Sequence, residues 1–201
     1  MSSIVIAGNT SGAITIAAPA EAGLNTLTLP ASTGTVALTS DIPAPVTTVQ
    51  THLNTTSSQS ITANTRANIS GLNATITPST TSKRIKVTVR WNGEYSSTVN
   101  YDATFGIKRD AIDIGNPAAD GSRNVGIAIL SQGYWAADAD STPDSVMYSY
   151  IDSPATTSAT TYHATFKQKT TGTLYNQRTV GDNNSTAFER LTSTIILEEI
   201  D

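Results

Sequence analysis

The chain has 201 residues, of which 14% are charged and 6% aromatic, with no cysteine and a formal net charge of −4. The lack of cysteine excludes disulfides, thiolate metal sites and a cysteine nucleophile. The sequence has no basic stretch of the kind that binds nucleic acid. No apolar run is long enough to span a membrane.

The first 43 residues are almost free of charge, since only Glu21 and Asp41 ionise there. Short runs rich in Ile, Val, Leu and Thr occupy residues 3–7, 13–17, 25–29 and 35–39, separated by Gly- and Pro-containing turns. Their apolar positions predict a docking face, which comprises Ile14, Ile16, Leu27, Leu29, Val36 and Leu38.

This N-terminal stretch cannot build a core of its own. Burial yields about 25 cal/mol per Å² of apolar surface, against about 1.5 kcal/mol of entropy for each ordered residue. We therefore predict that residues 1–43 form an extended β arm, which docks on a larger surface or intertwines with sister chains. An uncharged arm avoids the desolvation cost of burying ions.

Residues 44–60 are predicted to form a linker. Pro43 and Pro45 favour extended backbone on either side of its start. Val46, Val49 and Leu53 follow the spacing of one face of a short helix, although the threonines between them disfavour a helix.

Residues 61–201 are predicted to be an all-β domain, an antiparallel eight-stranded jelly roll. Turn signals separate runs with alternating hydrophobicity, and no convincing helix occurs. The expected strands are residues 61–76, 83–91, 101–107, 125–130, 145–151, 161–170, 174–180 and 187–200.

The clearest of these strands covers residues 83–91. Its alternate apolar positions predict one inward row, formed by Ile85, Val87, Val89 and Trp91. Asn92-Gly93 directly afterwards is typical of a hairpin turn. Gly71 is expected to permit a bend within residues 61–76.

The last strand is apolar on both faces, with Ile195 and Leu197 on one and Ile196 and Ile200 on the other. An exposed apolar edge of this kind would aggregate. The pattern therefore predicts a central strand close to a subunit interface, with these four residues contributing to a homotrimer contact.

No catalytic motif is present, so we expect a protein that is not an enzyme, with no cofactor and no dedicated metal site. The spacing of Asp138, Asp140 and Asp144 is also used by calcium loops, but the glycine and the terminal glutamate of such loops are missing. A solvated loop and a bound cation both stay open, as does a cation held by the C-terminal acids Glu198, Glu199 and Asp201.

Tyr134 and Trp135 precede this acidic loop. Together with Asp138 and Asp140 they are candidates for contact with a receptor such as a glycan. The alternative is that Trp135 packs beneath the loop as part of the core.

Residues 25–42, NTLTLPASTGTVALTSDI, resemble a Gly/Thr-rich segment of many tailed-bacteriophage virion proteins. The body, ending in RLTSTIILEEI, resembles the trimeric jelly-roll modules, TNF-like or C1q-like in shape, of phage fibres and decoration proteins. The resemblance implies a homotrimeric virion component, assembled in the host cytoplasm, whose partners are the major capsid protein or other virion proteins.

Two functions follow from this resemblance. The first is a capsid decoration (cement) protein that binds the outer capsid surface as a trimer and stabilises it. The alternative is a short tail or head fibre that binds a host-surface receptor such as a glycan. Neither function requires a membrane or nucleic acid as partner.

Overall fold

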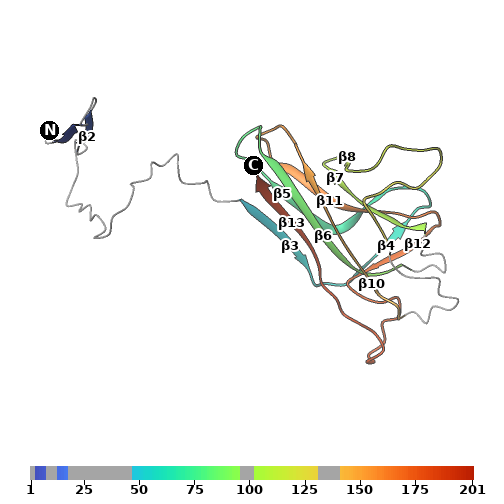
Figure 1. The fold of residues 1–201 in the computed structure, drawn as a ribbon. Helices are drawn as coiled ribbons and strands as arrows, with labels where there is room; N and C mark the ends of the chain where they lie inside the picture. The colour runs from blue at the N-terminus through green and yellow to red at the C-terminus, as the bar shows by residue number, and fades with distance from the viewer. Residues whose placement is uncertain (1–2, 8–12, 18–46, 96–101, 131–140) are drawn as a thin grey trace. The chain divides into compact units, whose positions relative to one another are not determined.

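The computed structural model describes residues 3–7, 13–17, 47–95, 102–130 and 141–201 (Figure 1). Within these residues every named element is a β strand, which confirms the all-β prediction. The chain divides into two compact units, Met1–Ala44 and Pro45–Asp201, each with its own internal contacts.

The first unit contains an antiparallel hairpin formed by β1 (Ser3–Ala7) and β2 (Ala13–Ala17). Its register pairs Ile4 with Ile16 and Ile6 with Ile14. The strands predicted at residues 3–7 and 13–17 are therefore confirmed. The expected strands at 25–29 and 35–39, with Leu27, Leu29, Val36 and Leu38, lie outside the described residues.

The second unit contains two antiparallel sheets. The large sheet has the strand order β3-β13-β6-β12-β4, and β10 also pairs with β6. The bounds of its strands are β3 (Thr48–Leu53), β4 (Ser57–Ile61), β6 (Arg84–Tyr95), β10 (Asp144–Asp152), β12 (Gly172–Asn176) and β13 (Ser193–Ile200).

The small sheet has the order β5-β11-β7-β8, with β9 also paired to β7. Its strands are β5 (Ala67–Ile76), β7 (Thr104–Arg109), β8 (Ile112–Ile114), β9 (Ala128–Ile129) and β11 (Thr160–Lys167).

Strand β6 organises the large sheet. Along one edge, β6 pairs with β10 over most of its length. Two strands share the other edge of β6: β13 pairs with its first half and β12 with its last residues. Figure 1 shows β3, β13 and β6 side by side. The expected strand at 187–200 corresponds to β13, which lies between β3 and β6 as a central strand.

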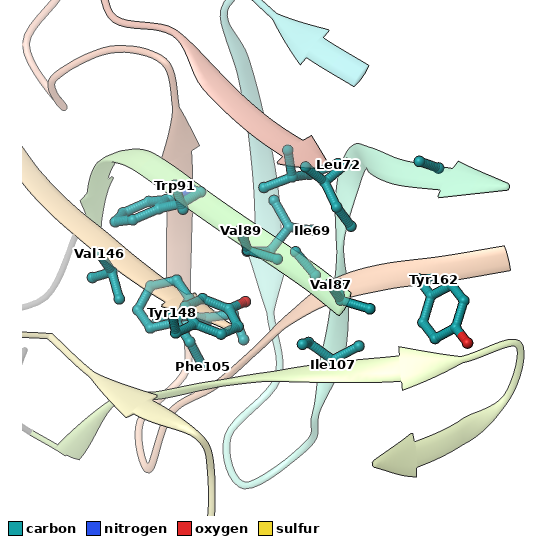
Figure 2. Close-up of a cluster of buried hydrophobic side chains, with 14 of the residues drawn as sticks. Ile69, Leu72, Val87, Val89, Trp91, Phe105, Ile107, Val146, Tyr148 and Tyr162 are labelled. Atoms are coloured by element: carbon teal, nitrogen blue, oxygen red, sulfur yellow. The ribbon is translucent and has the colours of Figure 1, made fainter. Parts of the chain in front are cut away.

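The core lies between the two sheets, which pack face to face as in a β-sandwich. The ring centroids of Trp91 on the large sheet and Phe105 on the small sheet lie 5.1 Å apart, and those of Phe105 and Tyr148 lie 6.1 Å apart (Figure 2). Tyr95 and Phe166 make a similar contact at 5.2 Å. These tilted ring pairs join the two layers directly.

The inward row predicted on β6 is confirmed, because Ile85, Val87, Val89 and Trp91 are all fully buried. Gly71 has a φ of +75° inside β5, close to a register shift between β5 and β11. The predicted bend at this glycine thus coincides with an irregularity in the pairing of β5 and β11, where the left-handed backbone favours glycine.

The turn predicted at Asn92-Gly93 is wrong, because β6 continues through both residues to Tyr95. A Cβ atom at Gly93 would lie 2.1 Å from the backbone oxygen of Tyr175 and 2.7 Å from the Trp91 ring. Glycine is needed here for the close approach of β12 and Trp91 rather than for a turn.

The stretch expected to be a linker, residues 44–60, contains β3 and most of β4. The short helix considered for these residues is also wrong, because Thr48–Leu53 form the strand β3. Residues Val49, Thr51 and Leu53 are half-buried while those between them are exposed, which is the period of a strand. Thr51, which is not part of the helical spacing Val46, Val49 and Leu53, occupies an inward position of this strand, and its β-branched side chain suits a strand.

Candidate interaction surfaces

The four residues predicted for a trimer interface lie on opposite faces of β13. Ile195 and Leu197 are 0% exposed and belong to the core of the sandwich. Their side chains therefore have no surface left for a partner chain. Ile196 and Ile200 are half-buried on the other face, where a second subunit could reach them.

The outer face of the large sheet mixes apolar and basic side chains. β10 presents Met147 and Ile151, which are 71% and 46% exposed. On β6, Lys86 donates to Glu198 of β13 at 2.8 Å, whereas Arg90 is exposed. This face can accept a partner surface that is partly apolar and carries few bases.

The three C-terminal acids considered for a cation each have a partner within the chain. Glu199 accepts from the backbone nitrogen and the hydroxyl of Ser79 at 2.6 and 2.7 Å, and these bonds lower the pKa of Glu199. Asp201 pairs with Lys83, which lowers the pKa of Asp201. Within the described part of the chain, no group of three or more metal-ligating side chains occurs.

A polar pocket of about 610 Å³ opens beside the start of β7 and β9. Its charged lining residues are Asp102, Arg123 and Lys169, and Lys169 lies 3.6 Å from Asp102. Asn124 holds this wall by donating to the backbone oxygen of Asp102 at 3.0 Å. Hydroxyl, amide and ionic groups around an exposed Ile129 suit a ligand rich in hydroxyl groups.

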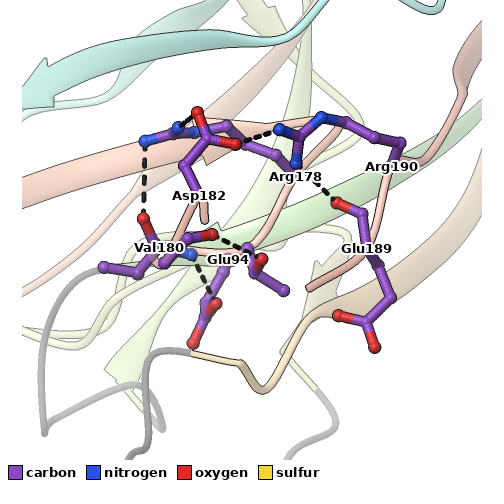
Figure 3. A network of polar contacts seen from close by, with 8 residues as sticks. Glu94, Arg178, Val180, Asp182, Glu189 and Arg190 are labelled. Carbon is purple, nitrogen blue, oxygen red and sulfur yellow. Dashed lines mark hydrogen bonds and ion pairs between the residues drawn. The ribbon is translucent and has the colours of Figure 1, made fainter. Parts of the chain in front are cut away.

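A buried acid ties together loops at one end of the large sheet. Glu94 is 1% exposed. One carboxylate oxygen accepts from the Thr142 hydroxyl at 2.9 Å and the other from the Val180 nitrogen at 2.7 Å (Figure 3). Nearby, Asp182 pairs with both Arg178 and Arg190. The network fixes the connection between β12 and β13.

A second buried network joins the two sheets. Asp152 at the end of β10 accepts from Arg109 at 3.0 and 3.1 Å and from the Tyr162 hydroxyl at 2.8 Å. Burial and the adjacent carboxylate raise the pKa of Tyr162. These contacts tie the end of β10 to β7 and β11.

Arg66 is held under the small sheet in a similar way. It donates to Thr165 at 3.1 Å, to Thr104 at 3.2 Å and to the backbone oxygen of Val125. Burial lowers the pKa of Arg66, and Asp113 at 3.8 Å opposes that effect.

The predicted receptor-contact residues Tyr134, Trp135, Asp138 and Asp140 lie outside the described residues. Asp144 is described and is largely buried at the start of β10, where its side chain accepts from the Ser145 nitrogen at 2.9 Å. Of the predicted docking residues, Ile14 and Ile16 lie on β2 of the hairpin.

Sequence reasoning did not single out Glu94, Arg109 or Asp152, because their partners lie far away along the chain. Glu94 carries no local signal either, because β6 also contains Arg84, Lys86 and Arg90, and only the fold separates the buried acid from these accessible bases.

No family model matches this chain, and no curated protein matches it either. Among the described residues, no helix is long and apolar enough to cross a membrane.

Proposed function

We propose that this protein is a bacteriophage capsid decoration (cement) protein, in which a jelly-roll body forms a homotrimer and the N-terminal arm docks on the capsid. One observation carries the proposal. The phage-like run at residues 25–42 belongs to a unit, Met1–Ala44, that is separate from the sandwich Pro45–Asp201.

The division of labour follows from the chemistry of the two units. The sandwich has its own core and can stand as a folded body. The arm carries only two ionisable side chains, Glu21 and Asp41, so its burial costs little desolvation of ions. Three arms on one trimer would bind neighbouring capsid subunits together, and the avidity of linked contacts would exceed that of any one arm. Stabilisation then comes from surface buried across the joints between subunits.

For the trimer contact we propose the outer face of β13, through Ile196 and Ile200. Both are half-buried and apolar, on a face whose neighbouring side chains are largely polar. This contact is separate from the core positions Ile195 and Leu197.

A second candidate function is a short fibre that binds a host-surface glycan. The polar pocket lined by Asp102, Arg123 and Lys169 supports it, because its volume and its hydrogen-bonding groups fit a sugar. Ile129 of this pocket lies a few residues before Tyr134 and Trp135 in the sequence.

Labelling of intact particles distinguishes the two functions. Gold-labelled antibody against this protein should cover the whole head in electron micrographs if it decorates the capsid. Label confined to the tail or to one vertex would support the fibre instead. Particles that carry no label at all would contradict both.

A further inference from the structure

The edges of the two sheets differ in how they are protected. On the free side of β5, the side chain of Gln59 takes the place of a neighbouring strand. Its amide nitrogen donates to the backbone oxygen of Asn68 at 2.6 Å, and its amide oxygen accepts from the Ser70 nitrogen at 3.0 Å. One side chain thus satisfies a donor and an acceptor that would otherwise invite another strand.

In the part of the chain that the structure describes, no side chain protects the free edge of strand β10 in this way. Among the described residues this strand pairs only with β6, over nine residues from Asp144 to Asp152. Edge strands β3, β4 and β8 are shorter, with six, five and three residues. Natural proteins usually keep unprotected edges short or place charge, proline or a bulge on them.

The composition of β10 also favours pairing. Residues 145–151, SVMYSYI, contain no charge, no proline and no glycine. Uncharged segments of this length with high β propensity are those that add to another strand most readily. The exposed Met147 and Ile151 stand on its outer face, where an added strand would cover them.

We propose that two copies of this chain pair antiparallel through β10, with Ser149 on the two-fold axis. In this register Met147 of one copy lies opposite Ile151 of the other, and the same contact recurs across the axis. Core-facing residues also match, because Tyr148 lies opposite Tyr150. The register brings no two charges together, whereas a shift that centres on Tyr148 would set Asp144 against Asp152.

The pairing joins the large sheets of two copies into one continuous sheet. It is a two-fold contact, so it closes on itself and does not propagate. A single strand pair buries less than the roughly 1,600 Å² of a standard interface, so the contact is weak and depends on concentration. It does not depend on the proposed function, and in a trimer it would link copies belonging to neighbouring trimers.

A cysteine introduced into the full-length chain tests this register, since the natural chain has none. In Ser149→Cys the two Cα atoms would face each other about 4.5–5.5 Å apart, within the range of a disulfide. Ser145→Cys is the matched control, because it is the same substitution at an exposed position on the same face. Its two copies would be about 26 Å apart along the strands.

Under mild oxidation we expect Ser149→Cys to form a covalent dimer at least about tenfold faster than Ser145→Cys. The reason is that the paired strands hold the two introduced thiols together at a high effective concentration before the disulfide forms. Adding Ile151→Lys to Ser149→Cys should remove this advantage while thermal unfolding shows that the protein stays folded. Equal rates for the two single variants, or a rate unaffected by Ile151→Lys, would overturn the proposal.

Discussion

Asp152 is the residue on which the link between the two sheets depends. It is largely buried and neutralises Arg109 while accepting a hydrogen bond from Tyr162. We predict that Asp152→Ala lowers the free energy of unfolding by about 3–5 kcal/mol, because Arg109 is left without its partner. Tyr162→Phe should cost about 1–2 kcal/mol, because only one hydrogen bond is lost.

Urea unfolding of both variants measures these losses. Asp120→Ala is the control, since its pair with Arg123 is exposed on both sides, and it should change stability by less than about 0.5 kcal/mol. An Asp152→Ala variant as stable as this control would show that the network contributes nothing.

Glu199 makes stability depend on pH on the acid side. Its hydrogen bonds from Ser79 lower its pKa in the folded state. A lowered pKa gives stability that is complete above the unfolded value of about 4.3 and is lost as pH falls through the folded value. Asp201, whose pKa is lowered by Lys83, acts in the same direction and in a similar pH range.

We therefore expect the difference in melting temperature between the natural protein and Glu199→Gln to be largest near neutral pH. It should shrink as the pH drops below about 4.3. Ser79→Ala is the companion variant, because it removes the hydroxyl donor and leaves the backbone donor. A difference that is constant between pH 7 and pH 3 would rule out this role for Glu199.

At the scale of elements, alternation was the reliable signal. It predicted the buried row of β6, from Ile85 to Trp91, whereas the central place of β13 was predicted from apolar residues on both faces of that strand. It missed β3 and β4, whose Ser, Thr and Gln give little hydrophobic contrast. Asn92-Gly93 misled because a dipeptide is local, whereas the need for Gly93 arises from distant Tyr175.

The candidate surfaces were less predictable than the fold. Hydrophobicity alone grouped Ile195, Ile196, Leu197 and Ile200 at an interface, and only the placement of two sheets separates core from surface. The pocket beside Asp102 and Lys169 depends on residues distant along the chain, so no local pattern indicates it.

The two faces of β13 should respond differently to substitution. Leu197→Ala removes fully buried atoms and should lower the free energy of unfolding by about 2–5 kcal/mol. Ile196→Asp should leave each protomer folded but abolish the proposed trimer, because it places an unpaired charge in the contact. Sedimentation velocity gives the mass, and a trimer that persists in Ile196→Asp would remove this face from the interface.

For the whole molecule, the separation of the two units predicts that the sandwich does not need the arm in order to fold. Deleting residues 1–44 should leave the melting temperature within a few degrees of that of the full chain, because the core that the structure describes lies in Pro45–Asp201. The same deletion should abolish binding to particles in a co-sedimentation assay. Loss of folded structure in the truncated chain would instead place the arm within the core.

The antiparallel pairing of β3 and β13 has a mechanical consequence. Thr48 lies opposite Glu198, and the Glu199 nitrogen donates to the Thr47 oxygen at 2.9 Å, so the chain enters and leaves the sandwich at the same end of this ladder. Tension between those two points would load the hydrogen bonds one after another and peel the strands apart like a zipper. A pull through the entry point alone, balanced by forces spread over the rest of the body, would not open the ladder in this way.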